Sequence, residues 1–282
     1  MSGGEYETIL IEKGDGITWV IFNRPEKRNA MSPQLHYDME AALDTLALDP
    51  ETRVLVITGA GGAFSAGMDL KLFFRNTASD PVERERSRHA SLNWAWHLLA
   101  KFPKPTIAMV NGYCFGGAFT QVVACDFAIA AEDATFGLSE INWGNLPGGL
   151  VSWNATRLLG FRDAMYYAMT GDSFDGLHAA RIGFVTRAVP AGTLRDETVA
   201  LARTLMDKNP MALRYTKEAI RAVRHMTVDE AQDYLRAKSD ALKHVDKEKG
   251  REHGMKQFLD DKTYRPGFEP YRRESGSGRG GQ

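Results

Sequence analysis

This 282-residue sequence contains little cysteine, has no long apolar run and carries no large excess of positive or negative charge. Its two cysteines, Cys114 and Cys125, are too few for a disulfide framework or a zinc-binding pattern, which favours a reducing cytoplasm. No uninterrupted apolar run approaches the roughly 18 residues that a membrane span needs. The first residues also lack the basic-then-apolar layout of a signal peptide. We therefore expect a cytoplasmic protein with no membrane partner.

The charges are nearly balanced, with 35 Lys and Arg against 36 Asp and Glu. No basic stripe with interleaved aromatic residues is present, so nucleic acid is not an expected partner. Seven histidines are scattered without the spacing of metal ligands, and we predict no metal site. What the sequence does contain is 43% hydrophobic residues, which predicts a globular chain with a sizeable core.

Short strand patterns alternate with helical patterns up to residue 192, which is typical of an α/β fold. Residues 8–12 and 17–22 predict a hairpin across the glycine-bearing turn 13–16. Ser32 followed by Pro33 marks a helix start, and the pair Asp49-Pro50 ends that helix. The other predicted strands are 53–58, 106–110, 126–131 and 134–138.

Beyond Gly192 only helical patterns remain, at 193–207, 211–226, 228–244 and 248–259. We therefore predict an α/β core over residues 1–192, which holds the catalytic and ligand sites. A C-terminal helical subdomain is expected over 193–270, acting in assembly or as a lid. The Gly/Ser-rich residues 271–282 are expected to form a flexible tail.

Two glycine-bearing turns, within 59–70 and 113–121, each follow a predicted buried strand. Backbone N–H groups at such turns attract negative charge. Neither turn has a P-loop or dinucleotide-binding layout, so phosphate is not favoured. The N–H groups would instead serve an oxyanion formed during a reaction, although glycines that only permit close packing remain an alternative.

Glu140 is the leading acid/base candidate, because the neighbouring Ile141 and Trp143 would desolvate its carboxylate and raise its pKa. The alternative is a glutamate that caps the backbone at a helix N-terminus.

Together these motifs resemble the crotonase (enoyl-CoA hydratase/isomerase) superfamily, and within it the hydroxycinnamoyl-CoA (feruloyl-CoA) hydratase-lyases. The superfamily resemblance rests on residues 23–31, 64–70, 104–112, 115–117, 125–126, 134–137 and 147–148. The resemblance to the hydratase-lyases rests on Lys71 and on residues 112–120, 136–144 and 254–262.

The resemblance implies a superhelix of repeated ββα units, assembled as a homotrimer or a dimer of trimers. It implies that the backbone N–H groups of Met68 and Gly117 hold the thioester oxygen. Common hydratases of the family carry two glutamates, but Thr120 replaces one of them here and leaves Glu140 alone. This predicts water addition to an arylpropenoyl-CoA, then retro-aldol cleavage to an aromatic aldehyde such as vanillin plus acetyl-CoA. Coenzyme A is then part of the substrate, and no separate cofactor is expected.

Ring recognition departs from the hydratase-lyase pattern, because Phe73 and Arg236 stand where the family has tyrosines that bind the para-hydroxyl. Tyr234 is two residues from Arg236 and would point to another helix face. Arg236 would bind a phenolate or be an ordinary solvated charge. Trp94 and Trp96 are available to an aromatic pocket, although core packing is the default for each. The further substrate-contacting candidates are Tyr113, Trp143 and Gly148, and the coenzyme A candidates are Lys27, Arg28, Ala30, Ala66, Asp69, Leu70, Phe258 and Lys262.

Two other functions remain open at this stage. The first keeps the fold and assigns another single-glutamate reaction, either hydration or isomerisation of an enoyl-CoA. The second is a crotonase-fold protein that binds without turnover, against which the presence of Glu140 and both glycine turns argues.

Overall fold

The computed structural model describes residues 6–265, 267 and 270–273. The chain divides into two compact units, Met1–Ala202 and Arg203–Gln282, and each is described by itself. The division falls inside a helix, α7 (Leu194–Met206), rather than at residue 192. Among the described residues, no helix is both long enough and apolar enough to cross a bilayer.

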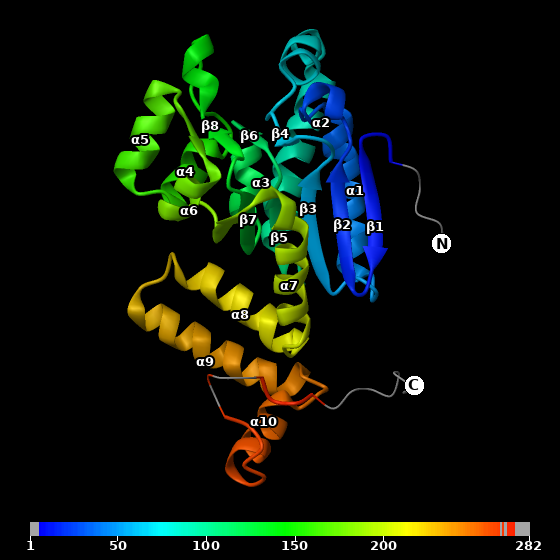
Figure 1. Cartoon of the computed structure of the whole chain (residues 1–282), viewed down its shortest axis with the longest axis vertical. Coiled ribbons are helices and arrows are strands. Elements are labelled where there is room, and N and C mark those ends of the chain that lie inside the picture. Colours follow the sequence, from blue (N-terminus) through cyan, green and yellow to red (C-terminus); the bar gives the residue numbers. More distant parts are fainter. Residues whose placement is uncertain (1–5, 266, 268–269, 274–282) are drawn as a thin grey trace. The chain divides into compact units, whose positions relative to one another are not determined.

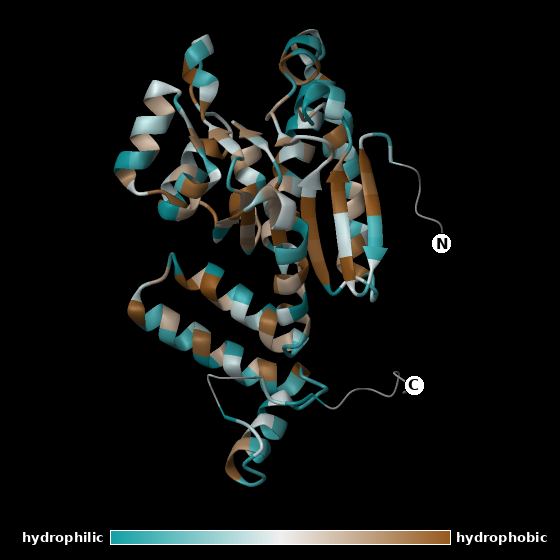
Figure 2. Ribbon diagram, viewed as in Figure 1, coloured by the Kyte–Doolittle hydropathy of each residue, from teal (hydrophilic) through white to brown (hydrophobic). Residues whose placement is uncertain are grey.

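The core of the first unit is a six-stranded sheet with the order β1-β2-β3-β5-β7-β10 (Figure 1). β1 pairs antiparallel with β2 in the predicted hairpin, and the other pairs are parallel. Every residue of β2, β3 and β5 is buried, as expected for parallel strands covered on both faces, and β3 is drawn mostly in brown in Figure 2. The strands are β1 (Ile9–Gly14), β2 (Ile17–Phe22), β3 (Val54–Gly59), β5 (Thr106–Val110), β7 (Phe127–Ala131) and β10 (Arg187–Val189).

A second sheet has the order β4-β6-β8-β9, and three of its strands come shortly after a strand of the first sheet. At Gly59 and Gly112 the chain passes from one sheet toward the other, and an added Cβ would lie 2.1 Å from a backbone oxygen at each position. The recurrence of two strands and then a helix confirms the predicted ββα units. These strands are β4 (Ala63–Ser65), β6 (Tyr113–Phe115), β8 (Thr135–Gly137) and β9 (Ser173–Asp175).

Helices cover the sheets of this unit. α1 begins as predicted, with Ser32 Oγ accepting a hydrogen bond from the amide of Leu35 and Pro33 at the first helical position. The short helix η5, which carries Glu140, directly follows β8. The α-helices are α1 (Pro33–Leu48), α2 (Pro81–Leu92), α3 (Ala118–Ala124), α4 (Val151–Leu158), α5 (Phe161–Thr170) and α6 (Gly176–Arg181). The shorter helices are η1 (Pro25–Lys27), η2 (Leu70–Arg75), η3 (Asn76–Ser79), η4 (Asn93–Leu98), η5 (Ser139–Trp143) and η6 (Ala191–Thr193).

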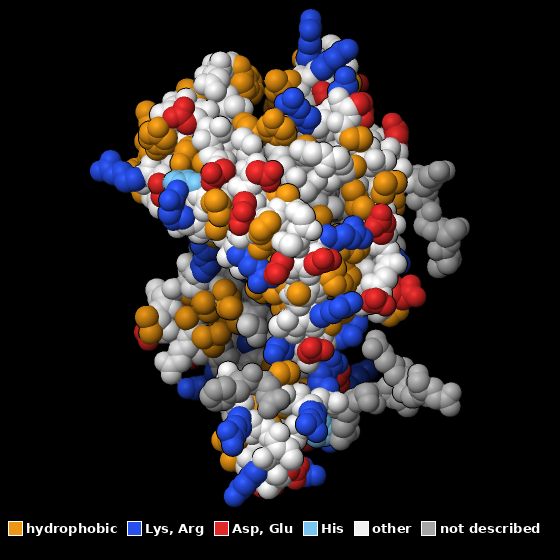
Figure 3. Space-filling view, in the orientation of Figure 1, with side chains coloured by type: hydrophobic (Ala, Val, Ile, Leu, Met, Phe, Trp, Pro, Cys, Tyr) orange, Lys and Arg blue, Asp and Glu red, His pale blue; other side chains and the backbone are white. Residues whose placement is uncertain are grey.

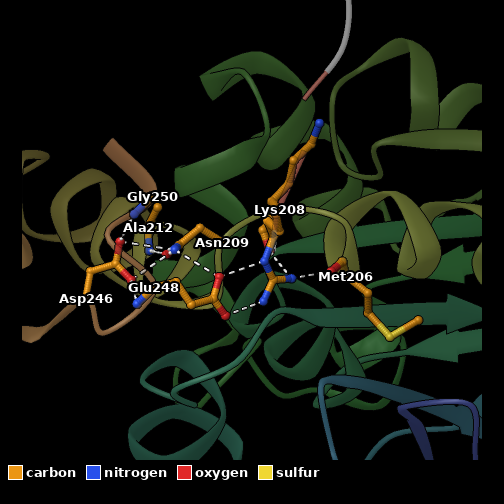
Figure 4. Close-up of polar contacts among 8 residues, drawn as sticks. Met206, Lys208, Asn209, Ala212, Asp246, Glu248 and Gly250 are labelled. Carbon is orange, nitrogen blue, oxygen red and sulfur yellow. Dashed lines mark hydrogen bonds and ion pairs between the residues drawn. The ribbon is translucent and has the colours of Figure 1, made fainter. Parts of the chain in front are cut away.

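The second unit is helical, with α8 (Pro210–Val223) packed against α9 (Val228–Val245), followed by α10 (Gly250–Leu259). Figure 4 shows Asn209 bonded to Asp246 and Glu248, and it also draws Met206 and Lys208, whose carbonyl groups accept hydrogen bonds from Arg273. Arg273 pairs with Glu248 and donates to both carbonyl groups. Residues 271–273, the described start of the predicted flexible tail, are therefore held in place, and 274–282 lie outside the described residues.

Candidate active site

A cavity of about 600 Å³ opens within the first unit, in the size range of small-molecule sites. It brings together nine of the residues that the sequence singled out, from loops and helices far apart in the chain. These are Ala66, Met68, Leu70, Phe73, Gly117, Thr120, Glu140, Trp143 and Gly148.

Glu140 is buried in η5 and is the one carboxylate among the described residues that line the cavity. Burial raises the pKa of its carboxyl group, as expected. Trp143 lines the same cavity, although Trp143 and Ile141 are themselves exposed, and the carboxylate also lies close to Gly116. No side-chain hydrogen bond caps η5, and Oε2 has no partner among the described residues; a backbone hydrogen bond within Glu140 itself offsets part of the effect of burial on its pKa.

Gly116 and Gly117 form the turn that faces Glu140. Gly116 has φ of 49°, in the left-handed region, and an added Cβ would lie 2.7 Å from Glu140 Oε1. An added Cβ at Gly67 would lie 3.3 Å from the amide nitrogen of Gly117, so this turn closely approaches the Gly67-Met68 segment.

The amides of Met68 and Gly117 are free to bind a ligand. The amide of Met31 donates to Gly67 O, and the amide of Asp69 donates to Met31 O, which fixes the chain on both sides of Met68. Neither Met68 nor Gly117 donates its own N–H to a described residue. Because the two segments are in contact and both line the cavity, the two N–H groups suit one negatively charged oxygen.

Thr120 lines the cavity from α3, and its Oγ1 accepts a hydrogen bond of 3.0 Å from Nδ2 of Asn154 on α4. Thr120 Oγ1 donates no hydrogen bond to a backbone carbonyl of a described residue. Sequence reasoning missed Asn154, because nothing local connects two residues 34 positions apart.

Phe73 is almost fully buried, and its ring meets those of Phe74 and His36 edge to face, at centroid distances of 5.1 and 5.2 Å. Burial lowers the pKa of His36 to about 3, so its ring is neutral and Nδ1 accepts a bond from the indole of Trp94. Trp94 is thus a core residue, and the ring of Trp96 packs on that of Trp153.

Tyr113 does not line this cavity. It is exposed on β6, where strand alternation turns Cys114 inward and Tyr113 outward, and the guanidinium of Arg28 stacks over its ring at 4.7 Å. Its predicted substrate contact therefore has no support in this geometry.

A second wall of the cavity was missed by sequence reasoning. Arg88, Ser91, Leu92 and Ala95 line it from α2 and η4. Their spacing of three, four and seven residues places them on one helical face, a signal that the sequence did contain. Arg88 is exposed and has no recorded ionic partner among the described residues, so its charge is available to a ligand.

The predicted coenzyme A residues of the first unit divide into two groups. Ala66 and Leu70 line the cavity, but the amides of Ala66 and Asp69 already donate to the carbonyls of Arg28 and Met31. The Asp69 carboxylate caps η2 and pairs with Arg24 at 3.1 Å, so its side chain shapes the loop. Lys27 is exposed beside Arg28, and Ala30 O accepts from Arg24.

Four predicted residues belong to the second unit, and their contacts with substrate stay predictions. Tyr234 is half-buried beside Lys238, and Arg236 is exposed. Phe258 is exposed and its ring lies 6.5 Å from that of Tyr264, while Lys262 is exposed with φ of 53°. Within the described ranges, no group of three or more His, Cys, Asp or Glu residues is placed to hold a metal ion.

The raised pKa of Glu140 gives a pH-dependent prediction. Because its folded-state pKa exceeds the unfolded value, the ionised carboxylate costs stability as pH rises through the folded-state pKa. We expect Glu140→Gln to gain stability relative to the wild type as the pH rises above about 4, the ordinary pKa of a glutamate. Thermal unfolding at several pH values measures this difference, and a constant difference across the range would contradict the raised pKa.

We compared the chain with known protein families, proteins and structures. The family model described as Enoyl-CoA hydratase/isomerase matches residues 12–268. A hydroxycinnamoyl-CoA hydratase-lyase of Pseudomonas fluorescens is 52% identical over 96% of this chain and 98% of its own. A probable enoyl-CoA hydratase of Mycobacterium bovis is 36% identical over 82% of this chain and 88% of its own. The crystal structure of an enoyl-CoA hydratase from Polaromonas sp. JS666 superposes with a TM-score of 0.82 at 29% identity, covering 90% of this chain and 97% of that one.

Proposed function

The chain belongs to the enoyl-CoA hydratase/isomerase (crotonase) family of enzymes, and on this basis we propose that it is a hydroxycinnamoyl-CoA hydratase-lyase. It would convert thioesters such as feruloyl-CoA and 4-coumaroyl-CoA to an aromatic aldehyde, such as vanillin, and acetyl-CoA. The observation that carries this proposal is a cavity in which Glu140 is the one carboxylate among the described lining residues, with Thr120 in place of a second. The 52% identity to a named hydratase-lyase supports the same reaction.

In the first step, Glu140 removes a proton from water as the water oxygen bonds to the β-carbon. The electrons of the carbon–carbon double bond move toward the thioester oxygen, which the amides of Met68 and Gly117 bind. Glu140 then returns the proton to the α-carbon, which gives the β-hydroxyacyl thioester. The raised pKa of Glu140 suits both transfers, because the group has to accept and release a proton in turn.

In the second step, Glu140 removes the proton of the β-hydroxyl group. The bond between the α- and β-carbons breaks, its electron pair passes to the acetyl-CoA enolate, and the β-carbon becomes the aldehyde. The same two amides hold the enolate oxygen until Glu140 protonates the α-carbon. One oxyanion donor typically lowers such a barrier by about 3–4 kcal/mol.

Ring recognition in this proposal falls to the wall formed by Phe73, Phe74 and Arg88. η2 packs against α2, so the aromatic side chains of one lie near the cationic side chain of the other. The guanidinium of Arg88 would bind the para-oxygen of the substrate ring, which a tyrosine binds in the family pattern. It would bind this oxygen more strongly when the para-hydroxyl group is ionised to a phenolate.

Arg88→Leu tests this role. We expect it to lower kcat/KM for 4-coumaroyl-CoA about tenfold, because a charge-assisted hydrogen bond is lost. Activity on cinnamoyl-CoA, which has no para-oxygen, should change little, and Arg84→Leu on the same helix is the control. Equal losses on both thioesters would contradict the role of Arg88.

The protein is proposed to need no cofactor, because coenzyme A is part of the substrate, and to act in the cytoplasm. We also propose a homotrimer or a dimer of trimers. Figure 3 shows hydrophobic side chains gathered over α8 and α9, where Ile220, Val228 and Leu235 are exposed. Light scattering coupled to size-exclusion chromatography measures the assembly, and a monomer at micromolar concentration would contradict it.

The experiment for the reaction is incubation with feruloyl-CoA, 4-coumaroyl-CoA, cinnamoyl-CoA and crotonyl-CoA. Aldehyde and acetyl-CoA from the hydroxyaryl thioesters would support the proposal. Hydrated crotonyl-CoA with no aldehyde from any aryl thioester would sink it and favour plain hydration, the activity in the names of several relatives.

A further inference from the structure

Thr120 is bonded differently from other helical threonines of this chain. Thr45, Thr170 and Thr198 each donate their hydroxyl proton to the carbonyl oxygen four residues earlier, at 2.8–3.0 Å. Thr120 makes no such bond to a described residue, since it is the third residue of α3 and the carbonyl four residues earlier, that of Gly116, lies before the helix. Its hydroxyl proton is therefore not consumed by the backbone.

The bond that Thr120 does make comes from Asn154, a fully buried residue of α4, which packs against α3. Nδ2 of Asn154 donates to Thr120 Oγ1 at 3.0 Å. The amide oxygen of Asn154 has no partner among the described residues. Burying a side-chain amide without hydrogen bonds costs free energy. Among the described residues, the bond to Thr120 is the side-chain hydrogen bond that offsets this cost for Asn154.

A threonine hydroxyl has one proton to donate and two lone pairs. Because a lone pair of Thr120 Oγ1 accepts from Asn154, the proton is left to point toward the cavity that Thr120 lines. Glu140 lines the same cavity, and its Oε2 has no partner among the described residues. A water molecule between them would accept from Thr120 and donate to Glu140, with its second lone pair free to attack.

We propose that Asn154 is a positioning residue of the active site, which turns the Thr120 hydroxyl so that it donates to the oxygen joining the β-carbon. This inference rests on the proposed function. The same oxygen is water in the first step and the β-hydroxyl in the second, where negative charge develops on it as Glu140 removes its proton. The Thr120 proton stabilises that charge in both steps, and donation from Asn154 strengthens it by polarising the hydroxyl.

A double-mutant cycle tests the coupling. Asn154→Ala is expected to lower kcat about tenfold with little change in KM, and Thr120→Val to lower it by at least as much. The double variant should be no slower than Thr120→Val, because Asn154 acts through a hydroxyl that is already absent. Losses that multiply would overturn the proposal. Thr156→Val, at an exposed position of α4, is the control for changes in that helix.

A binding measurement separates this inference from the proposed reaction. In a Glu140→Gln background, which prevents turnover, calorimetry compares 3-hydroxy-3-phenylpropanoyl-CoA with 3-phenylpropanoyl-CoA. The hydroxy ligand should bind about fivefold tighter, and adding either Asn154→Ala or Thr120→Val should abolish that preference. A preference retained in the Asn154 variant overturns the inference, even if the wild type cleaves no aryl thioester.

Asn154→Asp is expected to reverse the direction of the hydrogen bond between positions 154 and 120. Its carboxylate would accept the Thr120 proton, so a lone pair rather than a proton would face the cavity. We expect a larger loss of kcat than for Asn154→Ala. We also expect the acidic limb of the pH–rate profile to shift to higher pH, because a negative charge is added near Glu140. A variant as active as the wild type with an unchanged pH profile would contradict the proposed orientation.

Discussion

Glu140→Gln is expected to lower kcat for hydration and for cleavage by roughly 10⁴-fold, the upper end of what one general acid/base supplies. No other carboxylate among the described residues lines the cavity, so none there can replace it at any of the proton transfers. Gln keeps the size of the side chain but cannot accept the proton from water. Initial rates with 4-coumaroyl-CoA, monitored through the thioester absorbance, measure the loss.

The control for this variant is Glu85→Gln, an exposed position of α2 outside the cavity lining. Binding of coenzyme A should be unchanged in both variants, since the proposed coenzyme A contacts do not include either side chain. A Glu140→Gln enzyme that retains more than a tenth of the wild-type rate would contradict the assignment of Glu140 as the acid/base group.

Gly116→Ala is expected to lower kcat by at least about 10²-fold, the cost of displacing a catalytic group by roughly 1 Å. An added Cβ would stand 2.7 Å from Glu140 Oε1, and φ of 49° disfavours any residue with a Cβ. The carboxylate has to move, and the neighbouring amide of Gly117 moves with the turn. Kinetics together with thermal unfolding separate the catalytic loss from the cost in stability.

Gly183→Ala is the matched control for backbone strain. Gly183 has φ of 77°, also in the left-handed region, but an added Cβ would meet only an ordinary contact at 3.8 Å, and the residue does not line the cavity. It should lose stability of similar size and keep its activity. If the two variants lost activity equally, displacement of Glu140 would not be the cause.

The elements that the sequence predicted well are those specified by local signals. The apolar runs of β3 and β5, the hairpin of β1 and β2, and the Ser32-Pro33 start of α1 all depend on neighbouring residues. The glycine turns were also recognised, because glycine is the residue that permits such backbone conformations.

Local signals did not predict which side chains meet. Glu140 lies close to Gly116, 24 positions earlier, which no pattern around Glu140 indicates. Asn154 reaches Thr120 because α3 and α4 pack together, which no local pattern encodes. The spacing of the residues around Arg88 indicates that they share one face of a helix, but the position of that face in the cavity depends on the fold.

The central claim, hydration followed by retro-aldol cleavage with Glu140 moving each proton, is tested most directly by the isotope content of acetyl-CoA formed from feruloyl-CoA in D₂O. The α-carbon begins with one hydrogen and gains one deuteron on hydration and another when the enolate is protonated. We therefore predict that early acetyl-CoA carries two deuterium atoms in its methyl group, with an undeuterated aldehyde carbon. Acetyl-CoA with one deuterium or none, or no acetyl-CoA at all, would contradict the sequence of steps.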